Sequence, residues 1–172
     1  MPFPQLYQSE KRLVNFPGWS EPEQETDYVW FHSPIEIGGV VEADFILAGG
    51  AYKYHPDQHV SFELRVGVPG RRRKVPLARI DWRALSGGHS NRRGPDLPYA
   101  GQRVGDSHIH GFEINWLDDE GRMRTDLSQA EPLPEEIQSF ESLRDYAGKL
   151  FRISNIDIVS RPDWEYRLFH DG

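Results

Sequence analysis

The sequence predicts one α+β domain: an antiparallel sheet of about five or six strands, with one main C-terminal helix packed on a face. Three observations predict it. Residues 60–68 alternate apolar and polar side chains, the pattern of a strand with one buried and one solvated face. Short turns join this segment to its neighbours, which indicates an antiparallel meander. Apolar residues then recur at helical spacing in one segment near the C-terminal end.

The expected strands follow one another closely along the chain. They are residues 28–37, 40–47, 60–68 and 75–83. Gly38-Gly39, between the first two, is a two-residue hairpin signal. In the last of these strands, alternation places Arg79 and Asp81 on the face opposite the apolar residues.

The two ends of the chain differ in character. Residues 1–26 carry four prolines and a polar run, so we expect an irregular N-terminal arm there, followed by a single domain over residues 27–172. Near the other end, Pro134 and the acidic residues after it suit the first turn of a helix. Five apolar residues then share one helical face: Ile137, Phe140, Leu143, Ala147 and Leu150.

One long segment has no apolar periodicity. Residues 85–105 form a loop of about twenty residues, and loops of this length inside a compact domain are often functional. The loop leads into residues 105–117, which alternate like a strand. There His108 and His110 share the more apolar face and lie about 7 Å apart. Two imidazoles so placed can converge on one metal ion or one phosphate.

The composition limits the classes of function. The chain has 172 residues, no cysteine and no apolar run approaching about 18 residues, so we expect a soluble cytoplasmic protein with no membrane association. Its net charge of −7 argues against broad, nonspecific binding of nucleic acid. Positive charge is clustered, however, in residues 71–74 and in Arg92-Arg93, which leaves a local anion site open.

The strongest candidate site combines His89 from the loop with His108 and His110 from the strand. Neutral imidazole is the commonest protein ligand of zinc and related metals, so these histidines would hold a divalent metal, zinc or manganese. Asp81 would orient one of them. The same residues can also work without metal, one histidine as base and another as acid on a phosphodiester. A structural alternative packs His108 and His110 at the end of the sheet, hydrogen-bonded to loop backbone.

Cations near these histidines indicate a substrate class. Arg79 and Arg92 would hold phosphate in a bidentate way and place a nucleic-acid backbone near the histidines. RNA or another phosphodiester is therefore the expected substrate. Acidic residues concentrate in residues 118–145, and such an acidic surface also suits a protein partner.

The same region can be compared with the cupin pattern, in which His-x-His is followed by Glu and then Gly. His108, His110, Glu113 and Gly121 follow that order. Only two residues separate His110 from Glu113, however, which is shorter than the usual cupin spacing. Alternation also turns Glu113 away from both histidines.

Four short segments carry a further pattern. They are Leu77-Ala-Arg-Ile-Asp81, Gly88-His-Ser-Asn91, Asp106-Ser-His-Ile-His110 and Ser139-Phe-Glu-Ser-Leu-Arg-Asp-Tyr146. Over roughly residues 60–160 the chain resembles a family of short uncharacterised bacterial and phage proteins with an Arg-x-Asp strand, a Gly-x-His-x-Asn loop and a His-x-His strand. It departs from that family where Arg92 replaces the expected proline. The resemblance implies that Asn91 acts as one unit with Asp81 and the three histidines, on the substrate side, and it implies a toxin–antitoxin or phage-defence setting.

The leading hypothesis is a small cytoplasmic hydrolase, a phosphodiesterase or ribonuclease-like effector. Its catalytic residues would be His89, His108, His110 and Asp81. The competing hypothesis is a non-catalytic acidic binding module, such as a phage- or defence-associated inhibitor or adaptor. Alanine at His108 or His110 separates the two, because an enzyme would lose activity without losing its fold.

Overall fold

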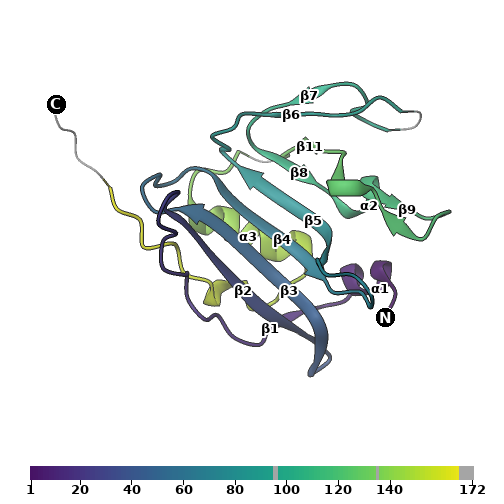
Figure 1. The fold of residues 1–172 in the computed structure, drawn as a ribbon, viewed down its shortest axis with the longest axis horizontal. Coiled ribbons are helices and arrows are strands. Elements are labelled where there is room, and N and C mark those ends of the chain that lie inside the picture. Colours follow the sequence, from purple (N-terminus) through teal and green to yellow (C-terminus); the bar gives the residue numbers. More distant parts are fainter. Residues whose placement is uncertain (95–96, 135, 167–172) are drawn as a thin grey trace.

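A seven-stranded antiparallel sheet forms the body of the protein in the computed structural model, which describes residues 1–94, 97–134 and 136–166 (Figure 1). The strands, in their order across the sheet, are β1 (Arg12–Leu13), β2 (Tyr28–Ile37), β3 (Val40–Tyr52), β4 (Val60–Val66), β5 (Val75–Trp82), β8 (His108–His110) and β11 (Glu131–Pro132). The predicted α+β class and antiparallel sheet are confirmed. The sheet has one or two strands more than predicted, because β1 and β11 at its edges are two residues long and show no alternation.

The main helix, α3 (Phe140–Phe151), covers one face of this sheet (Figure 1). The ring of Phe140 lies 6.0 Å from that of Phe62 on β4, centroid to centroid. The indole N–H of Trp82, at the end of β5, donates to the carbonyl of Ile137 just before the helix (3.2 Å). The predicted C-terminal helix is therefore confirmed, and it leaves the polar residues of the central strands on the opposite face.

The helix begins later than the sequence predicts. Ser139 is its N-cap, and the Ser139 Oγ accepts a hydrogen bond from the Ser142 N–H (3.1 Å). Pro134 and Ile137 precede the helix, although Ile137 is buried in the core. The predicted start at Pro134 is wrong because a serine cap five residues later satisfies the first free backbone N–H groups.

The first 26 residues are more ordered than an irregular arm. They contain α1 (Phe3–Gln8) and the edge strand β1, and they bury Leu6, Tyr7 and Leu13 in the core. The Tyr7 ring stacks on Phe112 with centroids 4.8 Å apart. The separate unit over residues 27–172 stays a prediction.

Lys11 ties this segment to the end of α3. Its side chain is 1% exposed, and its Nζ donates to the carbonyls of Tyr7 (2.6 Å), Ser9 (2.9 Å) and Phe151 (2.8 Å). Three acceptors match the three N–H bonds of an ammonium group. Burial opposes this charge and lowers the pKa of Lys11 to about 7.

The segment between β5 and β8 contains regular structure where a structureless loop was predicted. β6 (His89–Ser90) pairs with β7 (Arg103–Val104) in a separate two-stranded sheet. This small hairpin carries His89 toward the main sheet. Its pairs are too short to give a sequence signal.

The predicted strand over residues 105–117 is wrong beyond His110. The chain turns into α2 (Phe112–Asn115), where the Asn115 Nδ2 donates to the Gly111 carbonyl four residues back (2.8 Å). A second hairpin follows, in which β9 (Trp116–Leu117) pairs with β10 (Arg122–Met123).

Two 3-10 turns complete the described elements, η1 (Thr125–Leu127) and η2 (Ile156–Ile158). None of the helices in the described ranges has the length and apolar character that a membrane crossing requires.

Candidate functional site

Four of the predicted site residues, Arg79, Asp81, His108 and His110, meet where β5 and β8 pair on the polar face of the sheet. Asp81 lies directly opposite His108, and Arg79 directly opposite His110. The sequence placed the two histidines on the more apolar face of a long strand, and that prediction is wrong. Ile109 between them enters the core instead, at 3% exposure. Since neighbouring residues of a strand face opposite ways, burying Ile109 turns both histidines toward Asp81.

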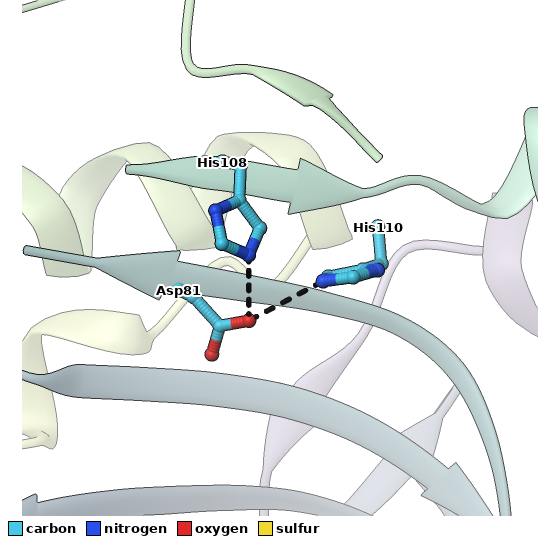
Figure 2. A group of neighbouring side chains, drawn as sticks. All are labelled: Asp81, His108 and His110. Atoms are coloured by element: carbon cyan, nitrogen blue, oxygen red, sulfur yellow. Dashed lines mark ion pairs between the residues drawn. The ribbon is translucent and has the colours of Figure 1, made fainter. Parts of the chain in front are cut away.

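Asp81 sits between the two imidazoles (Figure 2). Its Oδ2 lies 3.2 Å from the Nε2 of His108 and 3.4 Å from the Nε2 of His110. His108 is 4% exposed and His110 is 1% exposed. The three side chains therefore form one compact, largely buried cluster.

The other nitrogen of each histidine fixes the ring's proton. The Nδ1 of His108 lies 2.8 Å from the Gly105 carbonyl oxygen, and the Nδ1 of His110 lies 2.7 Å from that of Leu127. A carbonyl oxygen only accepts, so both Nδ1 atoms must carry hydrogen and donate. In the neutral rings, both Nε2 atoms then point a lone pair toward the Asp81 carboxylate. Such a cluster requires a cation or an added proton at its centre.

Arg79 supplies part of the missing positive charge. Its Nε donates to Asp81 Oδ2 (3.0 Å), and its Nη2 donates to the Nε2 of His110 (3.2 Å). Its Nη1 also lies 3.6 Å from Glu63 Oε2. Arg79 therefore satisfies the Nε2 lone pair of His110, whereas the Nε2 of His108 and the Asp81 carboxylate are left facing each other, open to a cation.

The pKa shifts of the cluster follow from the same contacts. Burial lowers the pKa of His110, against the raising effect of the nearby Asp81 carboxylate. Burial alone would raise the pKa of Asp81, but its contacts with the His108 and His110 rings and the charge of Arg79 outweigh it and hold that pKa far below its usual range. Asp81 is therefore a carboxylate throughout the physiological range.

The cluster can hold a metal ion. One donor atom from each of Asp81, His108 and His110 lies within 4.8 Å of the other two. Ligands about 2.0–2.1 Å from a tetrahedral ion stand about 3.3–3.4 Å apart, close to the two oxygen–nitrogen distances of the cluster. With both Nδ1 atoms bound to backbone, the free Nε2 lone pairs are correctly oriented donors.

His89 lies beside this cluster rather than in it. Its ring centroid is 4.8 Å from that of His110 and 5.9 Å from that of His108. Its Nε2 donates to the Ser128 carbonyl (2.9 Å). Among the described residues, Asp81 replaces His89 as the third member of the group that can share one ion. The predicted catalytic role of His89 stays a prediction.

Two predicted substrate-binding residues lie outside the cluster. Asn91 is buried, and its amide group donates to the Ala130 (2.7 Å) and Tyr99 (3.1 Å) carbonyls while its Oδ1 accepts from the Ala130 N–H (2.7 Å). It therefore holds the hairpin to the chain before β11. Arg92 is exposed and lines a different hollow. Glu113, the glutamate of the cupin comparison, is exposed on α2 and takes no part in the group that can share an ion.

A pocket of ≈ 190 Å³ opens beside Asp81 at the end of β5. Tyr28, Tyr52, His59 and Ser61 line it with Asp81. The hydroxyl of Tyr28 lies over a glycine of β3, Gly50, where a side chain would collide with it. The alternation of β2 and β4 is enough to place Tyr28 and Ser61 on this face.

His59 was not predicted as a site residue. It lies in the turn before β4 with a positive φ of 50°, so no strand pattern indicates where it points. Its Nδ1 accepts a hydrogen bond from the Leu85 N–H (2.7 Å), which leaves the ring proton on Nε2. Burial lowers the pKa of His59, against the raising effect of the Asp81 charge. His59 is therefore a neutral donor in the wall of the pocket.

Comparisons with models of protein families, with curated proteins and with solved structures found no match to this chain. The family resemblance drawn from the sequence stays a prediction.

Proposed function

We propose that the protein is a metal-dependent phosphodiesterase in which Asp81, His108 and His110 hold a divalent ion, zinc or manganese. One observation carries the proposal. Two histidine Nε2 atoms converge on one carboxylate oxygen, at 3.2 and 3.4 Å, while backbone carbonyls take both Nδ1 atoms. Two imidazoles and one carboxylate form a donor set found in catalytic zinc sites, which keep a position open for substrate.

A divalent ion at this position would polarise a phosphoryl oxygen and lower the pKa of water. The surrounding residues supply phosphate binding and a hydrogen-bond donor. Arg79 keeps Glu63 as a partner when it gives up Asp81, and its guanidinium then holds the phosphate. His59, which carries its proton on Nε2 in the wall of the pocket, donates a hydrogen bond to the leaving oxygen.

Hydrolysis of bis(p-nitrophenyl) phosphate tests the proposal. The purified protein is stripped with a chelator, reloaded with zinc or manganese, and assayed beside the double variant His108→Ala/His110→Ala. His32→Ala is the matched control, since His32 lies exposed on β2 of the same sheet and outside the cluster. We expect near-stoichiometric metal and hydrolysis in the wild type and the control, and neither in the double variant.

Two results would contradict the proposal. One is a protein that stays free of metal after reconstitution, as elemental mass spectrometry would show. The other is undiminished hydrolysis by a double variant whose far-ultraviolet circular dichroism spectrum matches the wild type. The first result, with no hydrolysis of the diester, would favour the acidic binding module instead.

A further inference from the structure

A basic groove runs between the β4–β5 turn and the β9–β10 hairpin. Its first part is a hollow of ≈ 520 Å³ lined by six cationic residues, namely residues 71–74, Arg122 and Arg124. A second hollow of ≈ 310 Å³ shares Arg122 and Arg124 with the first and adds Arg92 and Arg93. We call the two hollows together the basic groove. Eight of the chain's 20 lysines and arginines line it.

Most of these charges are not neutralised by acidic side chains. Among the described residues, one cation of the groove forms an ion pair: Arg122, whose guanidinium lies 3.0 Å from the Glu120 carboxylate. Asp126 is the one acidic residue in the described lining. Residues 71–74, Arg92 and Arg93 are exposed. On a chain with a net charge of −7, the groove is thus a local site of strong positive potential.

The groove and the candidate site share a wall. Thr125 and Ser128 line the groove. The carbonyl of Leu127 accepts from His110, and the carbonyl of Ser128 accepts from His89. The backbone that borders the groove therefore also holds the histidines.

Strand β5 connects the groove with the pocket beside Asp81. Val75 and Pro76, at the start of β5, line the groove, and Asp81, at its end, lines the pocket. Six residues of a strand span about 20 Å, a length that a few nucleotides cover. Tyr28 and Tyr52, whose ring centroids lie 5.2 Å apart, line the pocket as aromatic residues against which a base can pack.

We propose that the basic groove binds the phosphodiester backbone of a single nucleic-acid strand and leads that strand to the pocket beside Asp81. Seven of the eight cations are arginines, whose planar guanidinium binds phosphate through paired hydrogen bonds. A concave, arginine-lined hollow suits a strand that threads through it better than a flat membrane surface. Binding depends on the groove alone, whereas the role of the strand as substrate rests on the proposed function.

Fluorescence anisotropy with labelled single-stranded RNA of about 20 nucleotides tests the groove. Two charge-reversal variants each alter one hollow, Arg71→Glu/Arg72→Glu and Arg92→Glu/Arg93→Glu. We expect each to weaken binding at least about tenfold at about 0.1 M salt. We also expect each to reduce the slope of log affinity against log salt by about 1.4, since two phosphate contacts are lost at about 0.7 each.

The control variant, Arg12→Glu/Lys149→Glu, changes the net charge by the same amount outside both hollows. It should bind the RNA within about twofold of the wild type. Three results would each overturn the proposal that the groove binds nucleic acid. The wild type fails to bind the RNA, the control variant loses as much affinity as the groove variants, or polyglutamate displaces the RNA as readily as unlabelled RNA does.

Assaying bis(p-nitrophenyl) phosphate in the same samples separates the two proposals. This small diester needs the metal cluster and not the groove, so the Arg71→Glu/Arg72→Glu variant should hydrolyse it at the wild-type rate. RNA binding without any hydrolysis would support the proposal that the groove binds RNA and would refute the proposal that the protein is a phosphodiesterase. Hydrolysis of the small diester without RNA binding would refute the groove and leave the phosphodiesterase standing.

Discussion

Metal binding should stabilise the folded protein by a predictable amount. The three ligands come from β5 and β8, which are side by side only after folding, so an ion binds the folded chain and not the unfolded one. At a metal concentration about 100 times Kd, this linkage adds about 2.7 kcal/mol to the free energy of unfolding. For a chain of this size each kcal/mol raises Tm by about 2–4 °C, so we expect an increase of about 5–10 °C.

The Asp81→Asn variant isolates the contribution of the carboxylate. Asparagine keeps the shape of the side chain but removes its charge, so the increase in Tm on adding zinc or manganese should fall to about 1 °C or less. Without metal, the same variant should lose about 1–3 kcal/mol of stability, because Arg79 loses its charged acceptor. His32→Ala should show the full increase in Tm.

Differential scanning fluorimetry on chelator-treated protein, with metal titrated back, measures both effects. Metal binding at the cluster is refuted if no divalent ion raises the Tm of the wild type. It is equally refuted if Asp81→Asn gains as much as the wild type, because the ion would then bind elsewhere. Loss of the metal effect in His32→Ala would show that the effect is not specific to the cluster.

Three further predictions concern stability. Phe140→Ala should lower the free energy of unfolding, measured by urea denaturation, by about 3–5 kcal/mol. The reason is that Phe140 is fully buried between the sheet and Trp164. A loss below about 1 kcal/mol would contradict this packing. Ser139→Ala should cost about 1 kcal/mol in the same assay through loss of the helix cap, while Ser154→Ala, outside any helix, should cost less. Lys11 keeps its proton up to about pH 10.5 in the unfolded chain but releases it at about pH 7 in the folded chain. The free energy of unfolding of the wild type should therefore rise with pH between these two values, relative to that of Lys11→Met. A difference that stays constant with pH would show that the three carbonyls keep Lys11 charged.

The sheet was predictable where its strands are long. Alternation in β4 and β5 is enough to place Arg79 and Asp81 on the polar face, and the register confirms it by pairing Asp81 with Ser61 and Arg79 with Glu63. β8 is only three residues long, and its apolar neighbours after residue 111 belong to a helix. Pairing with β5 therefore determines on which face of the sheet His108 and His110 lie, and no local sequence pattern predicts that pairing.

The candidate site was predictable in its residue types but not in its assembly. His108, His110 and Asp81 were all singled out, yet Asp81 emerged as a possible ligand only once β5 and β8 were seen to pair. The basic groove could likewise not be predicted from the sequence. Arg122 and Arg124 lie in an acidic stretch of sequence, and only the fold brings them to residues 71–74.

The strand order also has a consequence for how the chain folds. β2, β3, β4 and β5 are joined in sequence as consecutive hairpins, whereas residues 83–107 separate β5 from β8. Because closing a short loop costs less entropy than closing a long one, we expect the hairpins to form first and β8 to join last. Until it does, β5 is an open edge that another chain can pair with, and the charges of Arg79 and Asp81 along that edge disfavour such pairing. The residues that later build the site would thus first protect the half-folded sheet from aggregation.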